Sequence, residues 1–588
     1  MFSIFIHAPP PQAAKLSTDP IFLSIMTFLT DKLINDFEFF SLRTIGNTAF
    51  TLGKLKLRNK PFLCALSNVR NKFVFQADPQ CLSSVAHYCA VVNHRSKELM
   101  VAIASVGERL MNGNSLDIAY TLWAFTTLNY KAPLIFQALE TNLASVVNNG
   151  NAVSLIMLVW SYAKVKRKCD ELYRLVAVHC ERIVATAPIE SLVDLAWAYA
   201  SNNSYKNPAM FEAVGKVKMN HYSTTLKHAA SLAWSMAHVG HDARAFFMAI
   251  IDKKIWLVAV TGSRIEELAS AQERESRRRA DCKSLSMLAF SFAKIGLFSS
   301  ELFKGISSVA FSSANKAASL TEDFTGEENC NLLWSYAIAG MINIVTIDFL
   351  KQLWRNPIKR TTMNITHTCL QQMYLFYISS SVIAPSLCNF HRPPTEMWNA
   401  IKFAGGKISE HRNRRDKRAI GKIRKLLEKM NLPVKRNVSP WIDNFDAEIN
   451  ENFLITDLFA RGQSQRKIAI EFDSNNRLAY PEVGSGSVTK PNGATKFKAR
   501  ILKALGFEIF NISSELWYQL NEEDEEEEEK EDGDGGEEEE RNAEAEGEEG
   551  EGEEDISNAL ISKRIEFLRE QLKLQQKEKQ KQKGIFLT

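Results

Sequence analysis

Apolar and polar positions along the chain repeat with a nearly constant period between residues 41 and 385. Bulky residues that recur within the local pattern, here called anchors, are Phe50, His87, Trp123, Trp160, Trp197, Trp234, Phe290, Trp334 and Tyr374. From Phe50 to Trp234 the anchors lie 36 or 37 residues apart, and insertions lengthen the later steps. Self-similarity at this period is typical of solenoids, in which each unit buries its apolar face against the next. The pattern therefore predicts an α-helical solenoid of about eight or nine helical pairs.

Each repeat is expected to contain two helices joined by a short polar turn. In the repeat from Ser115, apolar residues follow helical spacing up to Thr126, a turn covers Asn129 to Ala132, and Pro133 opens the second helix. The anchors suit tight packing between neighbouring helical pairs, and we expect them to be core residues rather than base-stacking platforms. A charged stretch between Asp252 and Asp281 is expected to form a helical surface excursion.

After Pro393 the helical period gives way to short alternating runs. A basic segment (402–436) is followed by strand-like segments at 453–459 and 467–473, an amphipathic helix at 495–507, a strand at 508–513 and a short helix at 514–520. This order predicts a small α/β domain. The predicted organisation is an irregular segment that is a candidate for targeting (1–40), the solenoid (41–385), a basic helical connector (386–437), the α/β domain (438–520), a disordered acidic insertion (521–556) and a C-terminal helix with a basic end (557–588).

Charge is distributed very unevenly along the 588 residues. Residues 522–555 hold 23 acidic residues against two basic ones, a local charge of −21. Because the whole chain carries +4, the remaining residues carry +25, which favours a polyanionic partner such as nucleic acid. A solvated, lysine-rich surface is the alternative. The acidic tract is either a tethered competitor for the basic surface, in which case deleting it should tighten RNA binding at low salt, or a solubilising linker.

Cysteine usage and hydropathy further narrow the class of protein to which the chain can belong. The nine cysteines form no CxxC pair, which excludes a zinc ribbon and favours a reducing compartment. We expect no membrane span, because the apolar run Ile21 to Thr30 is too short. The residues before Arg43 lack arginine and include Asp19 and Asp31, so they do not favour an organelle presequence. No phosphate-binding loop or kinase signature occurs, and no cofactor is expected.

The C-terminal segments resemble the RAP domain of organellar RNA-metabolism proteins. The matching features are KIAIEFD (467–473), KFKARILKALGFEIFNIS (496–513), Trp517 and the closing helix IEFLREQL (565–572). The repeats resemble the heptatricopeptide or octotricopeptide type that precedes RAP domains, and more distantly the FAST kinase-like proteins. The resemblance implies a restriction-endonuclease-like fold and RNA binding in mitochondria or plastids.

A nuclease activity would need carboxylates from adjacent strands to hold Mg²⁺. The candidates are Asp457, Glu471 and Asp473, of which the last two share a face of one strand. Relatives expected to cleave continue the strand's aspartate with Gly and then His, and both are missing here. A structural strand end is therefore favoured over catalysis, and an endoribonuclease remains the alternative function.

Basic residues near the RAP-like segment are candidates for RNA phosphate contacts. They are Arg412, Arg414, Arg415, Lys417, Arg418, Lys496, Lys498 and Arg500. Polar residues that follow the anchors are candidates for contacts to nucleotides, about one per repeat, as in helical RNA-binding repeats. They are Asn129, Lys164, Asn202, His238 and Lys294.

The sequence thus predicts a monomeric RNA-binding protein of an organelle, acting in RNA processing, RNA stability or ribosomal RNA assembly. Its partners are expected to be RNA and ribosomal or RNA-processing proteins, without a membrane. The expected compartment is the mitochondrion, with a plastid or apicoplast as the alternative. A protein-binding scaffold is a third reading, which the basic charge of the chain outside the acidic tract disfavours.

Overall fold

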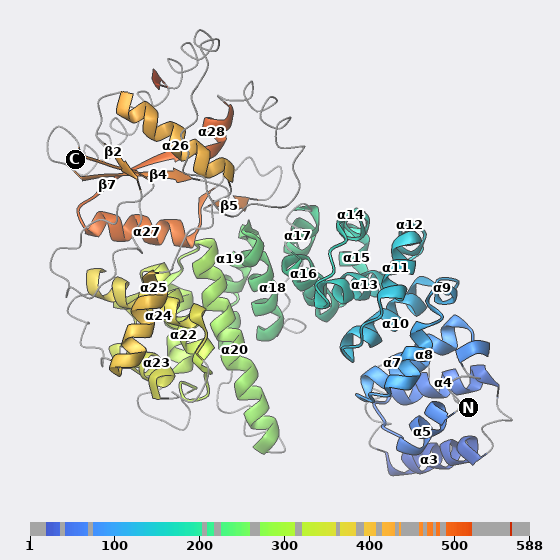
Figure 1. Ribbon diagram of the computed structural model, residues 1–588. Helices are drawn as coiled ribbons and strands as arrows, with labels where there is room; N and C mark the ends of the chain where they lie inside the picture. Colours follow the sequence, from blue (N-terminus) through green and yellow to red (C-terminus); the bar gives the residue numbers. More distant parts are fainter. Residues whose placement is uncertain are drawn as a thin grey trace, which may run out of the picture. The chain divides into compact units, whose positions relative to one another are not determined.

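A computed structural model describes most of the chain as helical, in two compact units (Figure 1). Unit 1 comprises Met1–Lys253 and Glu482–Gly486, and unit 2 comprises Lys254–Pro481 and Ser487–Thr588. The described residues are 19–519 and 565–566, with gaps at 36–40, 69–73, 203–207, 217–224, 259–270, 312–319, 360–364, 384–392, 407–413, 430–433, 437–457, 462–466, 474–477 and 482–489.

Unit 1 is a stack of helical pairs, as the repeat period predicts. The first helix of each pair, here called the A helix, packs on the A helix of the next pair. The A helices are α4 (Leu42–Lys54), α7 (Pro79–Val91), α10 (Ser115–Thr127), α13 (Ala152–Lys164), α16 (Ile189–Ser201) and α18 (Leu226–Val239).

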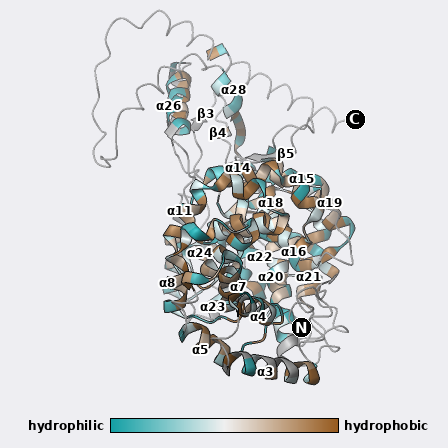
Figure 2. Cartoon of the chain, turned by 90° about the vertical axis from the view of Figure 1, so that its right-hand side faces the viewer, coloured by the Kyte–Doolittle hydropathy of each residue, from teal (hydrophilic) through white to brown (hydrophobic). Residues whose placement is uncertain are grey.

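The second helices, here called B helices, form their own series of contacts. They are α5 (Lys60–Asn68), α8 (Lys97–Ala104) with α9 (Gly107–Leu110), α11 (Pro133–Thr141) with α12 (Leu143–Asn148), α14 (Asp170–Val178) with α15 (Cys180–Thr186), α17 (Pro208–Gly215) and α19 (Arg244–Asp252). The short strand β1 (His241–Asp242) lies between α18 and α19. Hydrophobic and hydrophilic residues alternate along the ribbons, as expected for helices buried on one side (Figure 2).

Capping residues set where the A helices begin and end. The side chains of Asp78, Asn114, Asn151 and Thr225 each accept a hydrogen bond from a backbone N–H of the first turn, which offsets the unpaired donors there. At the other end the chain turns through a residue with positive φ, six positions after the anchor. In the repeat of Trp160 this is Lys166, after which the Arg167 N–H donates to the Tyr162 carbonyl in the pattern of a Schellman motif.

Unit 2 begins with further helices of the same kind. They are the 3₁₀-helix η2 (Ile255–Val258), α20 (Ala271–Ile295), α21 (Ser300–Ala310), α22 (Gly326–Ala339), the 3₁₀-helix η5 (Ile342–Ile344), α23 (Ile347–Lys359), α24 (His367–Ile383) and α25 (Thr395–Gly406). The A-type helices α20, α22, α24 and α25 pack in series. The stack therefore extends past the predicted boundary at residue 385, because α25 covers α24.

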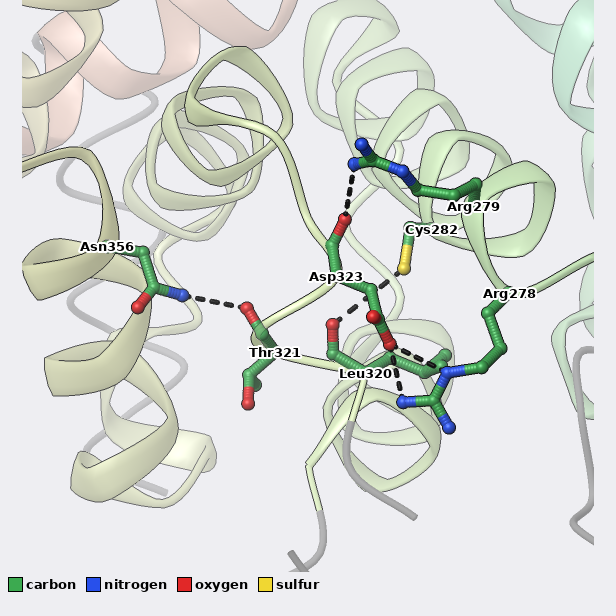
Figure 3. A network of polar contacts seen from close by, with 7 residues as sticks. All are labelled: Arg278, Arg279, Cys282, Leu320, Thr321, Asp323 and Asn356. Atoms are coloured by element: carbon green, nitrogen blue, oxygen red, sulfur yellow. Dashed lines mark hydrogen bonds and ion pairs between the residues drawn. The ribbon is translucent and has the colours of Figure 1, made fainter. Parts of the chain in front are cut away.

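The described end of the expected helical excursion is an N-terminal extension of α20, whereas residues 259–270 lie outside the described residues. Its residues 271–281 are helical, and the polar network in Figure 3 ties this extension to the segment before α22. The Arg278 guanidinium donates to the Asp323 carboxylate at 2.8 Å, and Arg279 donates to the Asp323 carbonyl at 3.1 Å. On the opposite side of this segment, Asn356 of α23 donates to the Thr321 carbonyl at 2.7 Å.

The rest of unit 2 contains an α/β domain built on a four-stranded sheet. Its elements are α26 (Arg414–Lys429), β2 (Val434–Arg436), β3 (Leu458–Arg461), β4 (Lys467–Asp473), α27 (Gly493–Ala504), β7 (Glu508–Ser513) and α28 (Ser514–Gln519). The strand order is β2-β3-β4-β7, with antiparallel pairing up to β4 and parallel pairing of β4 with β7. A short hairpin, β5 (Leu478–Pro481) with β6 (Lys490–Pro491), precedes α27.

Helices cover both faces of this sheet, α26 on one side and α27 on the other (Figure 1). Side chains alternate along β4, so Ile470 and Phe472 pack with α26 and Trp517, whereas Ala469 packs with Leu502 of α27. The predicted strands at 467–473 and 508–513 have the observed bounds. The predicted connector is divided differently, because α26 belongs to the core of the α/β domain.

Other expectations about segments differ from the structure or lie outside the described residues. The N-terminal segment is not irregular throughout, since Pro20–Asn35 forms helix α3, which contacts α5. The predicted acidic insertion lies outside the described residues, as does all of the C-terminal helix except residues 565–566. Among the helices that the structure describes, none combines the length and hydropathy needed to cross a membrane.

Candidate nucleic-acid interface

The anchors of the repeats form a row of partly exposed rings along the A helices. We call this the aromatic row: Phe50, His87, Trp123, Trp160, Trp197 and Trp234 in unit 1, and Phe290 and Trp334 in unit 2. Neighbouring rings approach one another, with centroids 5.4 Å apart for His87 and Trp123, 6.3 Å for Trp160 and Trp197, and 4.8 Å for Phe290 and Trp334. The expectation that the anchors are core residues is wrong for these positions.

The residue two positions after each anchor fills the core instead. Tyr162, Tyr199 and Tyr336 are fully buried, and the Tyr199 and Tyr336 hydroxyls donate to the Tyr173 and Phe303 carbonyls at 2.7 Å. These bonds join α16 and α22 to the B helices of the preceding pairs, α14 and α21. Positions two apart on a helix point about 200° away from each other, so an anchor and the residue after next cannot both face the core.

The last predicted anchor is out of register. Tyr374 is only 1 % exposed, whereas Tyr377, one turn further along α24, shares the partial exposure of the other anchors. The Tyr377 ring contacts the Trp398 ring of α25 at a centroid distance of 4.7 Å. The row in unit 2 therefore continues through Tyr377.

The imidazole of His87 acts as a neutral ring within the row. Burial lowers the pKa of His87 to about 4, so the side chain is uncharged at neutral pH. Its ring contacts the Tyr120 and Trp123 rings at 4.6 and 5.4 Å. His87 thus resembles the Phe and Trp anchors more than a cationic phosphate ligand.

Basic residues recur one helical turn after the anchors, on the same side of the helix. The residues at this position include Lys54, Lys164, His238 and Lys294. The His238 ring stacks on Trp234 at 4.8 Å, and the Lys294 ammonium lies 6.0 Å from the centre of the Phe290 ring. Burial lowers the pKa of Lys294 from its ordinary value. A partly exposed ring followed by a cationic group suits a base and its phosphate.

Of the five predicted nucleotide-contacting residues, Lys164, His238 and Lys294 occupy this shared position. Asn202 lies one residue later, at the end of α16, and Asn129 lies in the turn after α10. The structure therefore supplies the register that the sequence left open. Whether these side chains contact RNA remains a prediction.

The predicted metal ligands of the α/β domain are not brought together in the described residues. Glu471 is buried against α27, where the Lys498 ammonium lies 2.8 Å from its carboxylate. Asp473 ends β4, and Asp457 lies outside the described residues. Within the described part of the chain, no group of three or more His, Cys, Asp or Glu residues has a geometry that could hold a metal ion.

Two predicted phosphate contacts, Lys496 and Arg500, face the helical stack of unit 2. Lys496 donates to the Gly296 carbonyl at 2.8 Å, at the end of α20. Arg500 donates to the Ala337 and Ile338 carbonyls at 2.7 and 2.8 Å, at the end of α22. Cations at helix C-termini are favourable because they meet unpaired carbonyls and the negative end of the helix dipole. We reassign both residues, together with Lys498, to internal structure.

The basic residues around α26 are only partly described. Arg415 and Arg418 are exposed on α26, and the Arg415 guanidinium lies 4.0 Å from the centre of the Tyr518 ring. The Tyr518 hydroxyl donates to Asp416 at 2.6 Å, which joins α28 to α26. Arg414 and Lys417 belong to α26, but their side chains lie outside the described set, as does the whole of Arg412. Phosphate contact by these residues stays a prediction.

Comparison with known families places RNA-related models on both units. Residues 22–243 match the family described as RNA-editing substrate-binding complex 6 protein, and residues 475–530 match the RAP domain. A search of curated proteins found no match to the chain. The fold defines a helical-repeat protein with an α/β domain, and the matches indicate an RNA-associated role. A RAP domain match preceded by helical repeats agrees with the resemblance seen in the sequence.

Proposed function

We propose that this protein binds single-stranded RNA along its A helices, with bases stacking on the aromatic row. The observation that carries this proposal is the partial exposure of the anchor rings, with a basic residue one turn later in several repeats. Aromatic platforms combined with cationic groups bind unpaired bases of any sequence, because every base has a π-face. The name of the family matched by residues 22–243, which refers to binding of RNA-editing substrates, supports the same class of ligand.

The cellular setting follows from the family resemblance. We propose that the protein acts in the mitochondrion, in RNA processing, RNA stability or ribosomal RNA assembly, with a plastid or apicoplast as the alternative. The RAP domain match supports a role in organellar RNA metabolism. Imaging a tagged copy in cells, with an organelle marker, distinguishes these compartments.

The α/β domain supports a restriction-endonuclease-like fold without supporting cleavage. Its order α26-β2-β3-β4-α27-β7, with β4 and β7 parallel, agrees with the fold that the resemblance implies. Mg²⁺ does not fit at Glu471, because the Lys498 ammonium already neutralises this buried carboxylate. We therefore propose binding rather than endoribonuclease activity. Mg²⁺-dependent cleavage that is lost in Asp473→Asn would contradict this.

The proposal is tested by removing rings of the aromatic row and measuring affinity for a labelled oligo(U). Trp123, Trp160 and Trp197 are replaced by Leu, which keeps an apolar side chain for packing. Because stacking contributes about 1–3 kcal/mol per base, we expect at least a tenfold loss of affinity. Phe403→Leu is the matched control, since Phe403 is an exposed aromatic residue on α25 outside the row. Equal affinities of the triple variant and the control would refute the proposal, provided that both unfold at the wild-type temperature.

A further inference from the structure

The turn after seven of the helices, α4, α7, α10, α13, α18, α20 and α22, contains one residue in the left-handed region of the backbone. In these seven repeats it lies six positions after the anchor. The φ values are 55° for Lys56, 50° for Asn93, 57° for Asn129, 55° for Lys166, 78° for Gly240, 83° for Gly296 and 71° for Gly340. Its N–H group closes the turn, as where the Lys56 N–H donates to the Gly53 carbonyl.

The type of residue at this position depends on whether another element packs over the turn. In unit 2 the turns after α20 and α22 lie under α27, and both contain glycine. A Cβ at Gly296 would lie 3.0 Å from the Lys496 Nζ, and one at Gly340 would lie 2.8 Å from the Arg500 Cζ. A Cβ at Gly296 would also lie 3.1 Å from the Gly493 backbone nitrogen of α27, whereas a Cβ at Gly340 would displace only the end of the Arg500 side chain.

In unit 1 the first four turns of the series contain Lys or Asn instead. We call these four exposed residues the turn row: Lys56, Asn93, Asn129 and Lys166. None of their side chains makes a hydrogen bond or an ion pair with another residue that the structure describes. Among the described turns of unit 1 Gly240 is the exception, and it leads directly into β1.

Lysine in this conformation costs conformational energy that glycine would avoid. Strained residues of this kind persist where a function requires the side chain. For Lys56 and Lys166 no side-chain hydrogen bond or ion pair with a described residue offsets the strain. We therefore expect a bound ligand to provide the interaction that offsets the strain.

The surroundings of the turn row fit an anionic ligand. Lys54 and Arg58 flank Lys56. Exposed Lys164 and Lys168 flank Lys166. The neighbouring Arg167 is paired with Glu140 of the adjacent B helix at 2.7 Å, so this carboxylate is already neutralised.

The turn row and the aromatic row occur at fixed positions of the same A helices and their turns, six residues apart. A polyanion that carries flat, stackable groups along its length fits both rows together. Single-stranded RNA has this chemistry.

We propose that the turn row binds the phosphates of single-stranded RNA whose bases stack on the aromatic row. This inference rests on the proposed function and adds the path of the sugar-phosphate backbone, which follows the ends of the A helices in unit 1. The asparagines donate to phosphate oxygens through their amide groups, and the lysines supply charge.

The test replaces Lys56 and Lys166 by glycine, which removes two charges and relieves the backbone strain, so folding is preserved. Each phosphate contact on a single strand contributes about 0.7 to the slope of log affinity against log salt, so the double variant should lower the slope by about 1.4. The corresponding loss of oligo(U) affinity is about 10- to 30-fold at ~0.1 M salt. A Lys56→Arg, Lys166→Arg variant keeps the charges and should retain the wild-type slope.

Lys254→Gly is the matched control. Lys254 has φ 47° but follows a B helix, and its ammonium pairs with Glu301 at 3.2 Å. The inference would be overturned if log affinity fell equally steeply with log salt in the Lys56→Gly, Lys166→Gly double variant and in the Lys254→Gly variant. If the wild type binds oligo(U) and the Trp123, Trp160 and Trp197 triple variant does not, equal slopes overturn only the phosphate path and leave the proposed function standing. Absence of oligo(U) binding by the wild type would overturn the proposed function as well.

Discussion

Partial exposure of the anchor rings is the residue-scale feature on which the functional account depends. It was accessible in principle from the sequence, because an anchor and the aromatic residue after next lie on different sides of a helix. The pair Trp160 and Tyr162 illustrates this, since the tyrosine fills the core while the tryptophan remains partly exposed. Apolar character alone does not distinguish a ring that packs inward from a ring that lies on the surface.

The directions of Lys496 and Arg500 could not be predicted in the same way. Both residues lie on an amphipathic helix beside a basic segment, which by itself favours a solvated, phosphate-binding face. Their actual partners are carbonyls about 160 to 200 residues away in sequence, and only the docking of α27 brings them together. Tertiary contacts of this range leave no local pattern in the sequence.

His87 gives a pH prediction at the same scale. Burial lowers its pKa to about 4 in the folded chain, against about 6.5 when unfolded. Above pH ~6.5 both states are neutral and the stability is fully present. As the pH falls towards 4 the unfolded state binds the proton first, so the free energy of unfolding decreases by up to about 3 kcal/mol.

The measurement compares thermal unfolding of the wild type and His87→Phe at pH values of about 7 and 4.5. Phenylalanine is the anchor of the preceding repeat, at Phe50, so the substitution keeps a ring at this place. The wild type should lose more stability than the variant on acidification. If acidification lowered the unfolding temperatures of the two proteins equally, protonation of His87 would not be coupled to unfolding.

At the scale of elements, helices and strands could be predicted where apolar and polar residues alternate with a regular period. Short or isolated elements could not be predicted in this way. Strands β4 and β7 alternate clearly and pair in parallel, and both have their predicted bounds. The short strands β2 and β5 have no alternation long enough to be recognised. Helix α25 was assigned to a connector because the basic residues around it concealed the continuing stack.

Docking of α27 on the helical stack makes an element-scale prediction. A Cβ at Gly493 would clash with the carbonyl oxygen of Ala293, so Gly493→Val should displace α27 from α20 and break the contacts of Lys496 and Arg500. We expect a loss of about 3 kcal/mol in the free energy of unfolding, from overpacking and lost charged hydrogen bonds.

Urea unfolding, together with hydrogen exchange of the α27 amides, measures this effect. Lys503→Ala serves as the control, because Lys503 is exposed on the same helix. Faster exchange in α27 of the Gly493→Val protein is expected. Protection of α27 equal to that in the control would mean that the close approach of Gly493 to α20 does not hold the helix.

In the whole molecule, the proposed RNA-binding mode combines the positive charge of the chain with rings and basic residues that recur in regular order along the helical stack. Outside the acidic tract at 522–555 the chain carries +25, which favours polyanions over the protein partners of a scaffold. Charge alone attracts any nucleic acid. The aromatic row adds a preference for unpaired strands, since bases in a duplex are already stacked on one another.

Base stacking on the aromatic row can be detected by ultraviolet crosslinking of the full chain to oligo(U), followed by mass spectrometry of the crosslinked peptides. We expect crosslinks in peptides that contain Trp123, Trp160 and Trp197 and the turns after their helices, and we expect excess single-stranded RNA, but not duplex RNA, to suppress them. Crosslinks confined to B helices such as α8 and α14, or equal competition by duplex RNA, would contradict base stacking on the aromatic row.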